Sequence, residues 1–98
     1  MKHKNTVTLV GEIVSKPKYL ELNEDTKVLE FRLFTDAPMA KCYHTIKAWN
    51  ALASKFQELE EGETIQVKGA IRSRKYENKQ GVDVRVTEIN AEDLDFVL

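Results

Sequence analysis

The sequence predicts a small all-β domain with one short helix. Three observations support this fold class: apolar and polar residues alternate in several segments, turn-forming residues separate these segments, and only one segment has helical spacing. At 98 residues the chain has room for a single core, so we expect one domain over residues 1–98.

Three strand segments precede the helix, with residues 19–35 counted as one segment. Residues 7–14 are rich in β-forming residues and contain a glycine, which in a strand often marks a bend or a close backbone approach. Residues 19–22 and 28–35 flank a polar turn and predict either a hairpin or one long bent strand. Residues 36–41 contain a proline, which cannot donate to a strand ladder, so a loop is expected there. The strand of residues 42–49 follows.

One short helix is expected next. Asn50 suits the N-cap position, because its side chain can accept a hydrogen bond from the first helical turn. Leu52, Phe56 and Leu59 have the i, i+4, i+7 spacing of one helix face, and the helix is expected to end at Gly62.

Two strands complete the chain, at residues 64–76 and 82–89, with a turn at residues 78–81. Five β segments with one short helix between the third and the fourth is the order of an OB-fold, a five-stranded, partly open Greek-key barrel that commonly binds oligonucleotides or oligosaccharides. An SH3-like barrel is also compatible with this pattern.

The composition excludes several classes of protein. A formal net charge of −1 weighs against a chain that is basic all over, but the charges are unevenly distributed: residues 68–79 hold five basic residues and one acid. The single cysteine cannot form an internal disulfide. Because no apolar run has the length of a signal peptide or a membrane span, we expect a soluble, cytoplasmic protein.

Catalytic and metal sites are not expected. Cys42 and His44 lie two residues apart, but zinc needs three or four ligands and the only other histidine is His3. The chain has no glycine-rich phosphate loop and no nucleophile motif. We therefore predict no metal, no cofactor and no enzymatic activity.

The strand of residues 42–49 has an unusual distribution of side chains. Ile46 and Ala48 share one face and suit a core, whereas the opposite face carries Tyr43, Lys47 and Trp49. Large side chains of this kind on an outward face indicate a partner outside the domain.

The strand of residues 64–76 has a matching outer face. Ile65, Val67 and Ile71 share one side and are expected inside. The other side is basic and ends in an aromatic residue, with Lys68, Arg72, Arg74 and Tyr76. Cations attract phosphates and aromatic rings stack on bases, so the two strands together predict an interface for single-stranded nucleic acid.

Several stretches, in order and over nearly the whole chain, resemble the bacterial single-stranded DNA-binding protein (SSB) family. They are residues 5–11, Pro17, Tyr43-His44, residues 49–53, Gly62, residues 68–81 and residues 86–88. The resemblance implies an OB-fold that binds single-stranded DNA. It places Tyr43, Trp49 and Tyr76 at the positions of base-stacking aromatics, and Arg72, Arg74 and Lys75 in the basic strand. His44 matches a histidine at a subunit interface, which implies a homotetramer or a homodimer.

The chain departs from the family pattern in three places. Residues 36–41 form a shorter loop that lacks an aromatic residue, so the DNA path should be shorter. Glu60 and Glu61 stand where basic residues are common, which should weaken phosphate attraction. We expect no C-terminal linker or acidic tip. A shorter loop and the expected lack of an acidic tip fit a tailless primosomal accessory protein or a form encoded by a phage or plasmid.

The sequence thus favours a non-enzymatic, sequence-tolerant protein that binds single-stranded DNA in replication, recombination or repair, with a cytoplasmic, nucleoid-associated location. RNA as a ligand and replication proteins as partners are left open. One alternative is a primosomal or phage- or plasmid-encoded replication accessory. An alternative of another class is an OB-fold adaptor whose Tyr43 and Trp49 anchor a protein partner, because interface cores are also rich in these residues.

Overall fold

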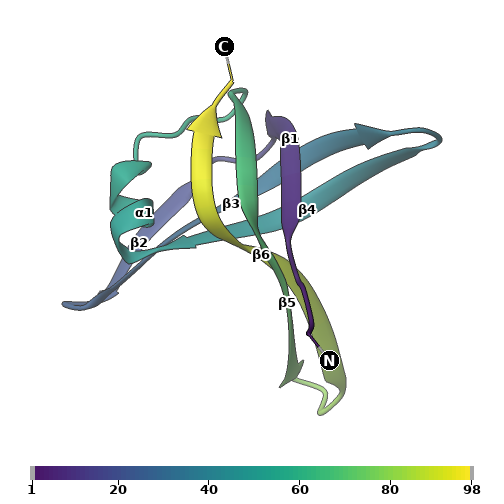
Figure 1. Cartoon of the computed structure of the whole chain (residues 1–98). Coiled ribbons are helices and arrows are strands. Elements are labelled where there is room, and N and C mark those ends of the chain that lie inside the picture. Colours follow the sequence, from purple (N-terminus) through teal and green to yellow (C-terminus); the bar gives the residue numbers. More distant parts are fainter. Residues whose placement is uncertain (1, 98) are drawn as a thin grey trace.

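The computed structural model describes residues 2–97, which form six strands and one short helix (Figure 1). In chain order these are β1 (Val7–Ile13), β2 (Lys18–Asn23), β3 (Thr26–Ala37), β4 (Ala40–Trp49), α1 (Asn50–Lys55), β5 (Thr64–Glu77) and β6 (Asp83–Phe96). Within residues 2–97, no helix has the length and apolar character needed to cross a membrane.

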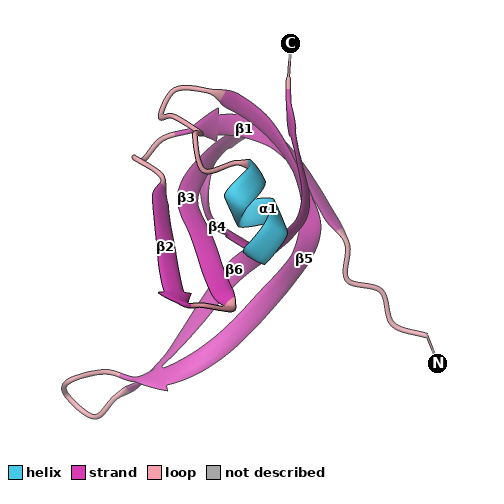
Figure 2. Cartoon of the chain, turned by 90° about the vertical axis from the view of Figure 1, so that its left-hand side faces the viewer, coloured by secondary structure: helices cyan, strands magenta, loops and turns pink. Residues whose placement is uncertain are grey.

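The strands form one sheet that closes on itself. Its order is β1-β5-β6-β4-β3-β2, and the end of β1 also pairs with β3, which completes the ring. All pairs are antiparallel except β4 and β6, which run parallel around Ile46 and Ile89. Figure 2 shows the strands curving around this ring, with α1 seen within it. The predicted small barrel with one helix is confirmed.

The inward side of the strands fills the barrel. Leu29, Phe31 and Leu33 of β3 are buried as their alternation indicates. The full core cluster consists of Ile13, Leu29, Phe31, Leu33, Ile46, Ala48, Ala53, Phe56, Leu59, Ile65, Val67, Ile89 and Leu94. Because successive side chains alternate, the residues between the core positions point to the outside of the barrel.

β2 and β3 form a hairpin, so residues 2–97 form six strands rather than five. The two strands pair from Lys18 opposite Glu30 to Asn23 opposite Thr26. The backbone N–H of Asp25 donates to Oδ1 of Asn23 at 2.8 Å, which closes the turn. The helix accordingly follows the fourth strand.

The expected N-cap at Asn50 is wrong. Trp49 occupies the N-cap position and makes no capping hydrogen bond with its side chain. Asn50 has a φ of 53°, and its Oδ1 accepts a 3.0 Å hydrogen bond from the backbone N–H of Lys27. The side chain therefore ties the start of α1 to β3. The helix ends at Lys55, well before the expected stop, although Phe56 in the turn that follows still packs into the core.

The expected loop at residues 36–41 is mostly strand. β3 and β4 stay paired as far as Ala37 opposite Ala40, and the chain reverses at Pro38 and Met39. The missing N–H of Pro38 is tolerated because this residue lies in the turn and not in the ladder.

The β3–β4 and β5–β6 hairpins extend beyond the barrel as two arms (Figure 1). The expectation that Ile71 faces the core is therefore wrong: its side chain is 48% exposed, because β5 has left the barrel at this point. β6 is also longer than expected, since residues 91–96 pair with residues 65–69 of β5.

Candidate nucleic-acid interface

β4 supplies the middle of the candidate interface. Ile46 and Ala48 are fully buried, as their side of the strand predicts. Tyr43 on the opposite side is 53% exposed, and Trp49 is half-buried. The outward orientation of the large residues is therefore a property of the folded chain.

The register of the sheet brings further residues beside them. The parallel pairing of β4 and β6 places Asn90 beside Lys47, and the β5–β6 ladder places Arg72 opposite Glu88. We call the resulting surface the outer face. It comprises Glu30, Arg32, Phe34, Tyr43, Thr45, Lys47, Trp49, Lys68, Arg72, Arg74, Tyr76, Val84, Val86, Glu88 and Asn90.

A buried carboxylate lies in this face. Glu88 is 3% exposed and is the one buried charged or polar residue among residues 2–97. Its Oε2 lies 3.4 Å from Nζ of Lys47, and its Oε1 lies 3.4 Å from Nε of Arg74. Nζ of Lys47 also lies 3.6 Å from Oε1 of Glu30. Two of the cations predicted to contact phosphate are thus held and electrically balanced within the protein.

Each predicted stacking residue has a neighbour that orients its ring. The Tyr43 ring lies 5.4 Å from that of Phe34, centroid to centroid. Nε1 of Trp49 donates to Oδ1 of Asn90 at 3.4 Å. The guanidinium of Arg74 lies 5.8 Å from the centroid of the Tyr76 ring, which is 45% exposed. These contacts reduce the freedom of the rings and leave surface for a stacked base.

Lys75 does not join the outer face. Its side chain points to the reverse side of the β5–β6 arm, because it alternates with Arg74 and Tyr76. Its Nζ lies 3.2 Å from Oδ2 of Asp83. Arg72 and Lys68 do lie on the outer face, where both are exposed, and within residues 2–97 neither forms an ion pair.

His44 lies on the inward side of β4, where the β3–β4 arm leaves the barrel. It is half-buried, and its Nε2 lies 2.9 Å from Oγ1 of Thr35. In the described part of the chain, no three His, Cys, Asp or Glu side chains gather as a metal site requires. His44 therefore has a polar partner, Thr35, within the same chain, without a second subunit.

Eight residues of the outer face are missing from the sequence-based prediction: Glu30, Arg32, Phe34, Thr45, Val84, Val86, Glu88 and Asn90. The alternation of residues 28–35 contains the signal for the first three, since the outward positions follow once the inward ones are known. The last two depend on which strand lies beside β4, and no local pattern contains that information.

Comparison with known proteins identifies the family and the fold of the chain. The model of the single-strand binding protein family matches residues 4–97. The chain is similar to a solved structure described as Plasmodium falciparum SSB complex with ssDNA, with a TM-score of 0.86 and 24% identity over 99% of this chain and 97% of that one. This likeness confirms the OB-fold. The comparison with curated proteins found no match.

Proposed function

The chain belongs to the single-strand binding protein family, which consists of non-enzymatic DNA-binding proteins, and we propose that it binds single-stranded DNA across its outer face without sequence preference. One observation supports the proposal: aromatic rings and cations lie on the outer face of three strands, β5, β4 and β3, and β6 joins β5 to β4 in the same sheet. Stacking tolerates any sequence because every base has a π-face.

The residues of the face divide into two roles in this proposal. Tyr43, Trp49 and Tyr76 stack on bases. Arg72 and Lys68 contact phosphates directly, because they are exposed and, among residues 2–97, form no internal ion pair. Lys47 and Arg74 approach phosphates while Glu88 holds them, which limits their contribution. Lys75 contacts only DNA that reaches the reverse side of the β5–β6 arm.

Such a protein would act where single strands are exposed, in replication, recombination or repair. We propose a cytoplasmic, nucleoid-associated location on the same ground. The DNA itself, and replication proteins that share it, are the proposed partners.

We also propose that the protein is a homo-oligomer, either a tetramer or a dimer. Between Val7 and Gly11, β1 pairs with β5 on one side and, within residues 2–97, with no strand on the other. An unpaired strand edge favours pairing with a second copy, and His44 is the residue that family resemblance assigns to an interface. Sedimentation at micromolar concentration should give a multiple of the 11.3 kDa chain mass, and a monomer alone would contradict the proposal.

Titration with oligo-dT at low salt tests the binding function. Trp49 is the only tryptophan, so its fluorescence reports on the middle of the face and should change saturably. Duplex DNA of equal length should bind more weakly, since its bases are not available for stacking. If the folded protein shows no response to either nucleic acid, the DNA proposal is wrong and the adaptor function becomes the better explanation of the exposed rings.

A further inference from the structure

A hollow adjoins the outer face where the chain passes from β1 to β2. Its volume is about 170 Å³, and its polar lining consists of Ser15, Lys16, Lys18, Glu30, Arg32 and Thr45. It forms because residues 14–17 leave the strand ladder. Ile13 pairs with Leu33 and Lys18 pairs with Glu30. Between these two pairs, only two hydrogen bonds join the segment to β3: the N–H of Val14 donates to the carbonyl oxygen of Arg32, and the N–H of Arg32 donates to the hydroxyl oxygen of Ser15.

The lining of this hollow is positive. It contains three cations, Lys16, Lys18 and Arg32, and one acid, Glu30. Glu30 is already 3.6 Å from Nζ of Lys47, whereas none of the three cations forms an ion pair within residues 2–97. All three are exposed, so their charges are available to a ligand.

The donors of the hollow are placed for an anion. Nη1 of Arg32 donates to Oγ1 of Thr45 at 3.4 Å, which directs the guanidinium along the wall. A guanidinium fork and ammonium groups supply only donors, and hydroxyls can donate as well, which matches the acceptor oxygens of a phosphate.

The hollow is continuous with the proposed stacking surface. Thr45 lies between Tyr43 and Lys47 on the outward side of β4. The guanidinium of Arg32 is 6.0 Å from the centroid of the Tyr43 ring. A nucleotide stacked on Tyr43 therefore has Arg32 beside it, and the backbone that continues from it meets the mouth of the hollow.

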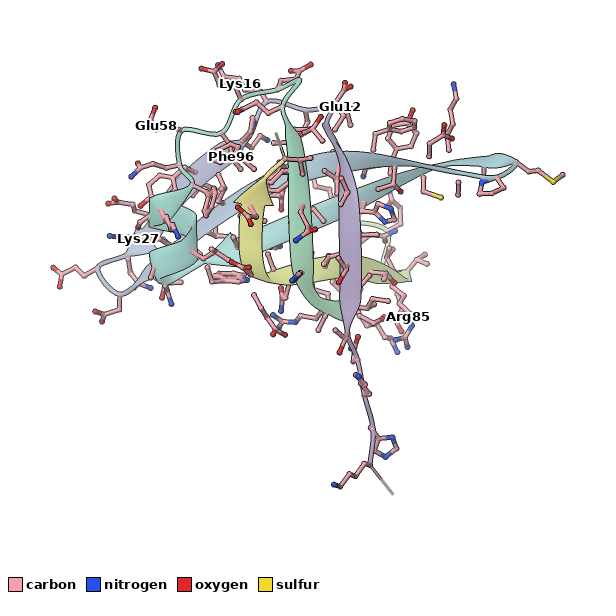
Figure 3. All side chains as sticks on the ribbon, turned by 45° about the horizontal axis from the view of Figure 1, so that its top comes forward. Glu12, Lys16, Lys27, Glu58, Arg85 and Phe96 are labelled. Atoms are coloured by element: carbon pink, nitrogen blue, oxygen red, sulfur yellow. The ribbon has the colours of Figure 1, made fainter. Side chains whose placement is uncertain are left out.

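We propose that this hollow, the β1–β2 pocket, binds a phosphodiester of the same single-stranded DNA and extends its path from Tyr43 to Lys16 and Lys18. The inference rests on the proposed function. The path ends there, because Lys16 also borders a second hollow lined by Glu58, Glu60 and Glu61, whose charges repel phosphate. Figure 3 shows Lys16 and Glu58 on the same side of the molecule.

The test measures binding of oligo-dT of increasing length across a salt series with the double variant Lys16→Gln/Lys18→Gln. For oligonucleotides long enough to reach the pocket, the slope of log K against log salt should flatten by up to about 1.4, because each lysine that no longer meets a phosphate lowers it by about 0.7. Oligonucleotides that cover only the region around Trp49 should keep their slope. For the oligonucleotides that are long enough to reach the pocket, Arg32→Gln should flatten the slope by about 0.7.

The matched control is Lys27→Gln/Lys55→Gln, which removes the same charge on the side of α1 and should keep the wild-type slope at every length. If the two double variants give equal slopes at every length while Trp49 still reports binding, the pocket is overturned and the proposed function stands. If the unmodified protein does not bind oligo-dT, both are overturned.

Discussion

The middle and the rim of the outer face are built differently. In the middle, Lys47 and Arg74 are held by the buried Glu88, and Trp49 is held by Asn90. The rim consists of Lys16, Lys18, Arg32, Lys68 and Arg72, which are exposed and, among residues 2–97, form no ion pair. A balanced and fixed cation adds little net attraction but limits the motion of its neighbours. In the proposed interface the middle therefore presents oriented rings, and the rim is expected to supply the attraction to DNA that depends on salt.

The largest expected effect comes from breaking the backbone beneath the middle. A Cβ at Gly69 would lie 2.0 Å from the carbonyl oxygen of Asn90 and 3.0 Å from Cα of Ala91. These are backbone atoms of the β5–β6 ladder, so they cannot move aside as a flexible side chain could. Gly69→Ala should lower the free energy of unfolding by about 3 kcal/mol or more, as measured by urea denaturation. Thr87→Ala, an exposed change on β6, should stay within about 0.5 kcal/mol of wild type, and equal stability of the two variants would refute the close approach.

The second effect concerns the ring at the middle. Trp49→Ala should weaken binding of oligo-dT by about 1 to 3 kcal/mol, because the base stacked on this ring loses its support. The salt slope should hardly change, since a stacked ring releases no counterion. Trp49→Phe should recover part of the affinity. If Trp49→Ala changes the slope as much as substitution of a rim arginine does, the ring is not acting by stacking.

The third effect comes from removing the carboxylate of the middle, so that its cations become unpaired as those of the rim are. Glu88→Gln leaves Lys47 and Arg74 without their shared carboxylate. Because these cations are 17% and 43% exposed and water can solvate them, we expect a loss of about 1 to 2 kcal/mol in the free energy of unfolding, less than for a fully buried pair. DNA binding should tighten, and the salt slope should steepen by up to about 1.4 if both cations then meet phosphate.

Glu24→Gln is the control for this variant, because it removes one negative charge in the exposed turn between β2 and β3, outside the outer face. It should leave both stability and slope near their wild-type values. An unchanged slope in Glu88→Gln would mean that Lys47 and Arg74 do not reach the DNA backbone.

The smallest effect compares one cation of each region directly. Arg72→Ala at the rim should flatten the salt slope by up to about 0.7, whereas Arg74→Ala in the middle should flatten it less, because Glu88 already balances its charge. The two arginines lie on the same side of β5, two residues apart, so they form a matched pair. Equal flattening would remove the distinction between middle and rim.

Local chemistry was sufficient to predict which side chains of each strand point outward. Alternation is a property of the strand backbone, so Tyr43, Lys47 and Trp49 share a side in any sheet that contains β4. The same reasoning correctly separated Arg72 and Arg74 from Ile65 and Val67. It failed for Ile71, because alternation states which side a residue faces but not whether the barrel still covers that side.

Turn and cap chemistry was less decisive, because a polar side chain can bond to any donor that the fold brings near. Asn50 has the chemistry of an N-cap, yet its Oδ1 accepts from Lys27 in the preceding hairpin. The polar turn between β2 and β3 likewise allowed a bend or a hairpin, and the hairpin followed from strand pairing.

The sequence by itself determined that rings and cations share the outward side of two strands, since residue order and the two-residue period of a strand are enough for that. Only the tertiary structure decided which of those cations are available. Lys47 and Arg74 come from strands on either side of β6, and the pairing of β6 with both places Glu88 between them. The Coulomb energy of an ion pair depends on the distance between charges in space, and for residues this far apart in the chain that distance exists only after the sheet has closed.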